Sequence, residues 1–135
     1  MKTLLTILFI SLLSSLSWSV TLGDLVEREG IYFQKFTDVP FTGKVTGKEK
    51  GSFKDGKWDG AWVRYHKNGQ LFSKGNYKNG KAEGASVGYY ENGQLMWKGN
   101  YKNGKEESSW IYFKENGERN DKLSGTYKNG KKISY

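Results

Sequence analysis

Apolar and polar residues alternate in short runs between Gly51 and Lys131, and regularly placed turn dipeptides separate the runs. Asp-Gly or Asn-Gly occurs at positions 55–56, 68–69, 79–80, 92–93, 103–104, 116–117 and 129–130. Both residues of such a dipeptide accept positive φ, and the resulting turn matches the twist of the flanking strands. The pattern therefore predicts an antiparallel meander of about eight to ten strands.

The same stretch is also a repeat. Its copies read GSFKDGKWDG, GNYKNGKAEG, GNYKNGKEES and GTYKNGKKIS, and they begin at Gly51, Gly75, Gly99 and Gly125. Units with a fixed period of this size bury surface against their neighbours in a stacked array. We therefore expect an all-β fold, an elongated and twisted single-layer sheet of β-hairpin repeats of about 24 residues each.

Comparison of the copies predicts which face of the sheet is packed. Two columns are apolar in every copy, Val63, Val87, Ile111 and Tyr65, Tyr89, Phe113. The opposite-facing column of Trp62, Ser86 and Trp110 varies. Because side chains alternate across a strand, the uniform columns are expected to form the packed face and the variable column the open one. In the second strand of each unit a tyrosine lies two residues after a glycine, and its ring can shield that glycine's backbone.

The N-terminus has the pattern of a signal peptide, residues 1–19. Met1-Lys2 precedes an apolar run from Leu4 to Leu16, and Ser17-Trp18-Ser19 places small residues where signal peptidase reads them. We expect a helix here, cleavage near Ser19, and export to the periplasm or the extracellular space. An uncleaved membrane tether is the alternative, although the run is short for a bilayer core of ~30 Å.

Residues 20–50 are expected to form an N-terminal cap, a degenerate first repeat that covers an open sheet edge. Within it, residues 22–26 fit a short helical turn or a loop, and residues 31–34 and 41–45 fit strands. Residues 51–135 then hold the repeats and a C-terminal cap.

The amino-acid composition excludes most kinds of catalytic site. The chain has no cysteine, which excludes disulfides, thiolate metal sites and thiol nucleophiles. His66 is the single histidine, so neither a Ser-His-Asp triad nor a histidine metal cluster is expected. Asp59, Glu83 and Glu107 each lie two residues after a lysine, which favours surface ion pairs over a proton donor. We predict a non-enzymatic protein without cofactor or metal.

The formal charge of +8 favours anionic partners. Two lysine columns recur with the repeat, Lys54, Lys78, Lys102, Lys128 and Lys57, Lys81, Lys105, Lys131. In a regular sheet they form ladders with rungs ~9.5 Å apart, suited to an anionic lipid surface or envelope polymer. The alternative is that these lysines only keep the sheet from pairing with other chains.

The tryptophans supply a second kind of candidate surface. Trp58, Trp62, Trp97 and Trp110, together with Arg64, could anchor a partner. The alternative is that these rings pack within the sheet.

The phrase GNYKNGKAEG, followed by Tyr-Tyr-x-Asn-Gly-Gln-Leu, closely resembles the bacterial variant of the MORN repeat (membrane occupation and recognition nexus). The chain also looks like bacterial proteins described as antitoxins of a toxin–antitoxin module built from such repeats. The resemblance covers residues 51–131, and Pro40-Phe41-Thr42-Gly43 looks like the degenerate opening of these proteins.

This resemblance implies a twisted sheet of hairpins with a binding or scaffold role. It also implies a protein partner, with a toxin as one candidate. Nucleic acid is not the expected partner, and the oligomeric state is not predicted. The chain departs from the repeat pattern where Ser86 replaces a tryptophan and Ser108 a glycine, so no role is expected to rest on a full tryptophan row. Export implies an envelope or extracellular target.

Overall fold

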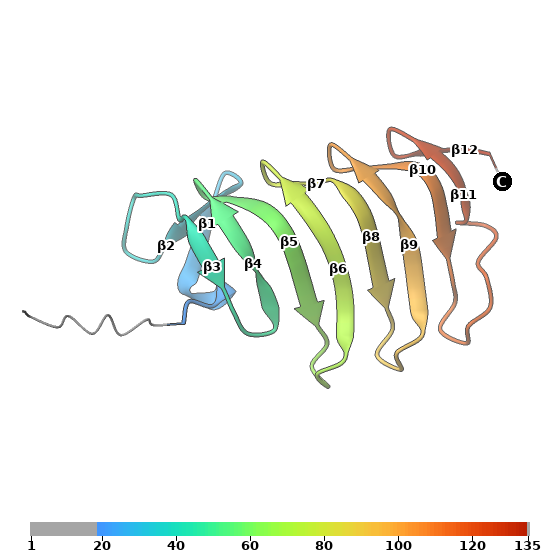
Figure 1. Ribbon diagram of the computed structural model, residues 1–135, viewed down its shortest axis with the longest axis horizontal. Helices are drawn as coiled ribbons and strands as arrows, with labels where there is room; N and C mark the ends of the chain where they lie inside the picture. Colours follow the sequence, from blue (N-terminus) through green and yellow to red (C-terminus); the bar gives the residue numbers. More distant parts are fainter. Residues whose placement is uncertain (1–18, 135) are drawn as a thin grey trace, which may run out of the picture.

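The computed structural model describes residues 19–134, and almost all of its regular structure is β-strand (Figure 1). A 3-10 turn, η1 (Leu22–Asp24), is followed by β1 (Leu25–Arg28), β2 (Ile31–Gln34), β3 (Gly43–Val45), β4 (Glu49–Lys54), β5 (Lys57–Tyr65), β6 (Leu71–Lys78), β7 (Lys81–Ala82), β8 (Gly84–Tyr89), β9 (Leu95–Lys102), β10 (Lys105–Tyr112), β11 (Gly125–Lys128) and β12 (Lys131–Ser134). Within these residues no helix has the length and hydropathy of a membrane span. The predicted signal-peptide helix lies, apart from Ser19, outside the described residues.

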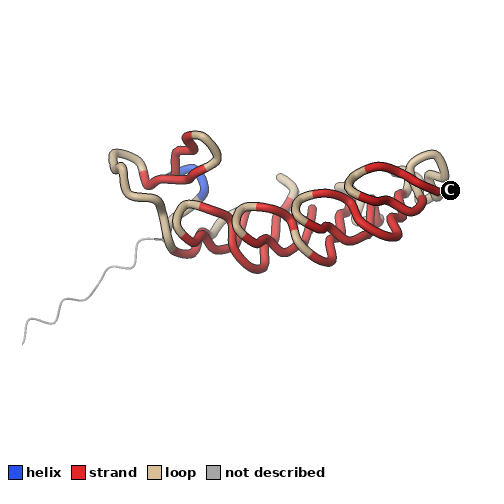
Figure 2. The backbone as a smooth tube through the Cα atoms, turned by 90° about the horizontal axis from the view of Figure 1, so that it is seen from above, coloured by secondary structure: helices blue, strands red, loops and turns tan. Residues whose placement is uncertain are grey.

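The main sheet is an antiparallel meander, which confirms the predicted fold class. Its strands follow chain order from β3 to β12, with the short β7 paired to β6 beside that path. Figure 2 shows a single layer, with the β1–β2 hairpin standing out from it at the N-terminal end. Each repeat therefore adds neighbouring strands to one growing sheet.

The seven turns belong to two kinds. At Asp55, Asn79, Asn103 and Asn129 φ is +50°, and the glycine that follows has φ between +75° and +78°. These four are tight two-residue turns, as predicted. At Asn68, Asn92 and Asn116 the chain reverses direction as predicted, but only the following glycine has positive φ, so the expected turn with two positive-φ residues is wrong there. The reason is a longer loop. The backbone N–H of His66 donates to Gln70 at 2.8 Å, and the Asn68 side chain accepts the Gln70 N–H at 3.0 Å.

The packed face is the opposite of the one predicted. Trp62 and Trp110 are only 2% and 1% exposed, whereas Val63 and Val87 on the other face are half-buried. Trp62 stacks on Trp58 with ring centroids 4.0 Å apart. In a sheet one layer thick, the face with the larger rings buries more area, and a uniform column of smaller residues does not mark the core. We call the packed side the ring face; it carries Phe53, Trp58, Trp62, Tyr77, Trp97, Tyr101, Trp110 and Tyr127.

Rings do lie over glycines on this face, but they are tryptophans from the neighbouring strand. A Cβ built on Gly51 would fall 2.2 Å from the Trp62 ring, and one on Gly99 would fall 2.2 Å from Trp110. Only glycine allows such an approach. The predicted tyrosines do not fill this role: Trp62 and Trp110 cover Gly51 and Gly99, and the atoms nearest to a Cβ on Gly75 belong to Ser86.

The N-terminal segment covers one end of the ring face. Leu25 joins a buried cluster with Val45, Phe53 and Trp62. Tyr32, on the opposite strand of the hairpin, has its ring centroid 4.9 Å from that of Phe53. The strand predicted at 31–34 is confirmed as β2, and the one predicted at 41–45 is shortened to β3. Residues 22–24 take the helical-turn alternative as a 3-10 turn.

Candidate binding surfaces

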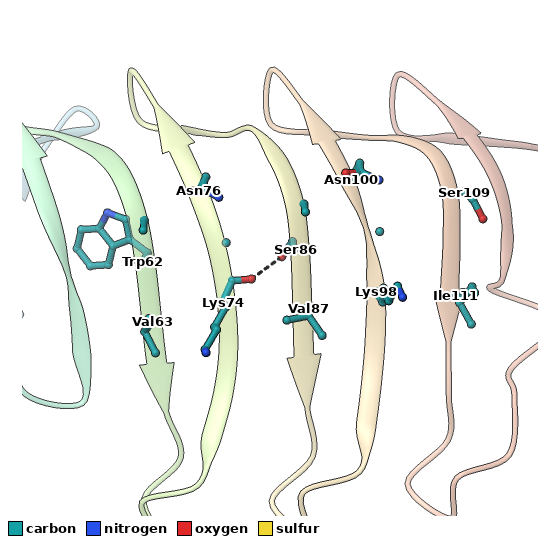
Figure 3. A pocket seen from close by; sticks show the side chains of 14 residues that line it. Trp62, Val63, Lys74, Asn76, Ser86, Val87, Lys98, Asn100, Ser109 and Ile111 are labelled. Atoms are coloured by element: carbon teal, nitrogen blue, oxygen red, sulfur yellow. Dashed lines mark hydrogen bonds between the residues drawn. The ribbon is translucent and has the colours of Figure 1, made fainter.

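The face opposite the rings is hollowed by a groove of about 580 Å³, which we call the central groove (Figure 3). One row of side chains crosses it at the same level on β5, β6, β8, β9 and β10. The register pairs Val63 with Lys74, Lys74 with Val87, Val87 with Lys98, and Lys98 with Ile111. Apolar and cationic side chains thus alternate strand by strand along the groove.

A second row adds small and amide side chains. Ala61 faces Asn76, and Ala85 faces Asn100. Small residues keep this part of the groove open, and the two amides offer both donors and acceptors. The groove can therefore bind an apolar surface that carries negative charge and hydrogen-bonding groups.

Sequence reasoning missed this site. It placed the Val63, Val87 and Ile111 column in the core, and it did not single out Lys74 and Lys98. The sequence does contain a signal for these lysines, because lysine recurs with the 24-residue period at positions 50, 74 and 98. These lysines alternate with the apolar column only after the strands are paired in register.

The eight lysines predicted as ladders are all exposed, and the structure brings the two columns together. Across the tight turns the register pairs Lys54 with Lys57, Lys78 with Lys81, Lys102 with Lys105, and Lys128 with Lys131. They form one cationic edge of the sheet, the lysine edge, at the tight turns. This edge is distinct from the central groove.

The acids near this edge bind the next turn. Glu83 accepts the backbone N–H of Asn103 at 2.8 Å, and Glu107 accepts that of Asn129 at 3.0 Å. Within residues 19–134 neither carboxylate forms an ion pair with a lysine, so the expected lysine–acid pairs are wrong at these positions. Each carboxylate instead fixes one unit against the next, because a backbone N–H to a carboxylate is a strong charge-assisted bond.

The tryptophans divide into buried and half-buried rings. Trp62 and Trp110 cannot anchor a partner, because they are almost fully buried and donate their indole N–H to the carbonyls of Ser52 and Asn100 at 3.2 and 2.9 Å. Trp58 is half-buried, and the guanidinium carbon of Arg64 lies 4.6 Å from its ring centroid. That contact is a cation–π pair, and Arg64 also approaches Glu49 at 4.0 Å.

Trp97 is also half-buried, and its ring lies over Gly88. Trp58 and Trp97 therefore keep their place as candidate contact residues, together with Arg64.

Tyrosines on and beside the ring face have raised pKa values. Burial, followed by a hydrogen bond to the Glu106 carboxylate, raises the pKa of Tyr112 far above its ordinary value of 10.0. Burial, followed by the charge of Glu106, raises the pKa of Tyr101 as well. Both phenols stay protonated at neutral pH.

His66 has a structural setting. Its Nε2 lies 2.8 Å from the carbonyl oxygen of Tyr89, one repeat further along. Its Nδ1 lies 3.9 Å from the Glu91 carboxylate. The side chain is only 14% exposed, so the imidazole is largely buried between neighbouring repeats. Across the part of the chain that the structure describes, no three potential ligand side chains gather as a metal site would require.

Comparison with known proteins points to the same repeats. Residues 58–79 and 82–103 match, in tandem, the family model described as MORN repeat variant. The two matched stretches carry Val63, Lys74, Val87 and Lys98, and so include most of the central groove. No curated protein matches the chain.

Proposed function

From two tandem MORN-variant repeats with an open, grooved face, we propose that this chain is a binding or scaffold protein whose central groove holds an acidic segment of a protein partner. The alternating row in the groove is the observation that carries the proposal. Val63, Val87 and Ile111 are only half-buried, and within residues 19–134 neither Lys74 nor Lys98 forms an ion pair. An apolar stripe that is crossed by unpaired charges is a typical interaction surface.

The spacing of this row favours a helical segment. Neighbouring strands lie ~4.8 Å apart, so the three apolar residues recur about every 9.5 Å, with a lysine between each two. A helix advances ~5.4 Å per turn, so two turns approach this repeat. A helix lying across the strands can place apolar residues on alternate turns and acids on the turns between. An extended segment repeats one face every ~6.6 Å and fits less well.

A toxin is one candidate for this protein partner, because the resemblance implies that the chain acts as an antitoxin. The proposal includes export through residues 1–19, which brings the partner to the envelope or outside the cell. Co-expression with the product of an adjacent gene tests the toxin role. Death of the host without this chain, and survival with it, is the expected result, and a harmless neighbour contradicts that role.

The groove itself is tested by capture from envelope extract with the chain from Val20 onward. Lys74→Glu combined with Lys98→Glu reverses the charges in the groove, and we expect it to abolish recovery of the captured protein. Lys78→Glu combined with Lys102→Glu is the matched control, because it makes the same charge change on the lysine edge. We expect that control to retain the partner.

A Val87→Asp chain completes the experiment, since it places a carboxylate between the two lysines and removes an apolar contact. Loss of the partner with both groove variants and retention with the edge variant supports the proposal. Equal loss with groove and edge variants contradicts it, because binding would then follow net charge alone.

The lysine edge carries a second candidate function, binding to anionic lipid or envelope polymer. The observation in its favour is the pairing of exposed lysines at four successive turns. Sedimentation with vesicles that contain anionic lipid tests it. Binding that weakens with salt and with the edge variant supports it, and no sedimentation at any salt concentration contradicts it.

A further inference from the structure

A slot of about 260 Å³ lies on the ring face, on the other side of the sheet from the central groove. It is found in the repeat that begins at Gly75, which we call the middle repeat because it lies between the first (from Gly51) and the third (from Gly99). There Ala82 and Ser86 take the positions of Trp58 and Trp62 one period earlier. In the first repeat those two indoles stack with centroids 4.0 Å apart. The middle repeat therefore lacks two large rings, and the slot lies in their place.

The walls of the slot are aromatic. Trp62, Tyr77, Trp97 and Tyr101 line it, and Arg64 lies among the lining residues. Such walls suit a flat ring, which can pack against them face-to-edge or in an offset stack. The volume is below the ~300–1,000 Å³ of sites for drug-sized ligands, and it fits a single side chain better than a larger molecule.

The neighbouring repeats show how a ring sits in this position. Trp62 lies over Gly51 and donates its indole N–H to the Ser52 carbonyl at 3.2 Å. Trp110 lies over Gly99 and donates to Asn100 at 2.9 Å. In both cases the acceptor is the carbonyl of the residue directly after the glycine. The equivalent pair in the middle repeat is Gly75 and Asn76.

In the middle repeat this glycine and this carbonyl are present, but no ring covers them. The atom nearest to a Cβ built on Gly75 is the Ser86 hydroxyl oxygen, at 3.4 Å. The Asn76 carbonyl accepts the Glu83 N–H at 2.8 Å, and a carbonyl oxygen has a second lone pair. Gly75 and Asn76 thus provide the platform and the acceptor that an indole uses in the other two repeats.

A second observation is independent of the repeat comparison. The indole N–H of Trp97 is buried and has no hydrogen-bond partner among the described residues. Buried donors in proteins are nearly always paired, and an unpaired one calls for an explanation. Trp97 also lines the slot, and this donor is covered in the unliganded chain, so an acceptor on a ligand reaches it when the ring turns on binding.

We propose that the slot binds the side chain of a tryptophan from a protein partner, seated over Gly75 and donating to the Asn76 carbonyl. The cationic Arg64 among the lining residues favours acidic residues next to that tryptophan, and a flanking carboxylate or carbonyl is the acceptor for Trp97 once its ring has turned. This site lies on the opposite face from the central groove, so either proposal can fail without the other.

The experiment uses the ¹⁵N-labelled chain from Val20 onward and a blocked peptide, acetyl-Asp-Asp-Trp-Asp-Asp-amide. Titration is expected to shift the indole N–H resonance of Trp97 and the amide resonance of Gly75. The same peptide with alanine for tryptophan is the control probe. Indole alone and N-acetyl-tryptophanamide test whether the flanking residues contribute.

Ser86→Trp restores the ring of the other repeats and should fill the slot. We expect it to weaken peptide binding at least tenfold while the unfolding midpoint stays equal or rises. Ser86→Leu is a second filling variant should the larger ring disturb folding. Gln70→Trp, on an exposed turn, is the matched control for an added tryptophan and should bind as the unaltered chain does.

Tryptophan-dependent shifts at Trp97 and Gly75 that both Ser86 variants remove support the proposal. Equal shifts with the alanine peptide contradict it, because charge alone would explain them. Absence of any shift at these two residues contradicts it as well. Indole that binds as tightly as the acidic peptide contradicts the protein side chain as the source of the ring.

Discussion

The first and third repeats differ from the middle one in how each uses the same position on the ring face. Trp62 and Trp110 close the outer repeats by packing over Gly51 and Gly99, whereas Ser86 leaves Gly75 uncovered. The glycine, the tight turn and the register recur in all three, although the strand that is continuous as β5 and β10 is divided into β7 and β8 in the middle repeat. The fold thus tolerates the loss of a ring in one repeat while its neighbours hold the sheet, and the repeat that lost it gains a slot.

The largest effect should come from removing a ring that covers a glycine. Trp62→Ala is expected to lower the free energy of unfolding by ~3–5 kcal/mol, through lost burial and the cavity left behind. Ser86→Ala, the matched change in the middle repeat, loses only a 3.3 Å bond to the Lys74 carbonyl and should lower it by about 1 kcal/mol or less. Urea unfolding measures both, and similar losses would show that the two repeats do not differ as described.

The glycines provide a smaller and more local contrast. Gly99→Ala places a methyl group against the Trp110 ring and should lower the free energy of unfolding by ~1–3 kcal/mol. Gly75→Ala meets only the Ser86 hydroxyl at 3.4 Å, and we expect no loss or a gain of up to ~1 kcal/mol, because alanine restricts the unfolded chain. Thermal unfolding of the Gly99→Ala and Gly75→Ala variants measures this difference. Equal destabilisation by the two changes would contradict the finding that no ring covers Gly75.

The third repeat should also be sensitive to alkali. The pKa values of Tyr112 and Tyr101 are raised above 10.0 in the folded chain, so above pH 10 the unfolded chain loses phenolic protons that the folded chain keeps. Stability from these groups is complete below pH 10 and falls as the pH rises further. The slope is at most ~1.4 kcal/mol per pH unit for each phenol, and less here because both rings are partly exposed.

Unfolding midpoints measured from pH 9 to 11.5 give this slope. Tyr112→Phe should flatten it, and Tyr89→Phe, on the other face, is the control that should not. A slope unchanged by Tyr112→Phe would refute the assignment.

The smallest expected effect concerns Ser108, which departs from the glycine of the other repeats. Its φ is +59°, close to the +75° and +80° of Gly60 and Gly84. A side chain in this region is strained by ~1–2 kcal/mol, and glycine relieves that strain but gives the unfolded chain more freedom. Ser108→Gly should therefore raise the free energy of unfolding by about 0.5–1 kcal/mol. Gly84→Ser should lower it by a similar amount, and a loss of stability with Ser108→Gly would contradict the explanation.

Much of the fold could be predicted from the repeat. The strands, the meander order and the tight turns follow from a 24-residue period and its Asn-Gly dipeptides. The three longer turns could not, because the same dipeptide also suits a loop in which only the glycine has positive φ. Ser108 shows the same limit, since a serine takes the conformation of a glycine when its neighbours fix the bulge.

The two faces could not be assigned by uniformity alone. The Val63 column looked like a core because it is apolar in every copy, and the Trp62 column looked open because one repeat carries Ser86. In a single-layer sheet the area that each ring buries decides, and Trp62 and Trp110 bury more than any valine. The central groove was therefore hidden from sequence reasoning, because its apolar floor had been assigned to the interior.

The assignment of the faces is the central claim, and one comparison of unfolding free energies tests it. Val87→Ser and Trp110→Ser introduce the same residue on opposite faces of the sheet. We expect a loss below ~1 kcal/mol for Val87→Ser, which lies in an open groove, and ~3–5 kcal/mol for Trp110→Ser, which opens the packed face. Equal losses, or a larger loss for Val87→Ser, would contradict the claim.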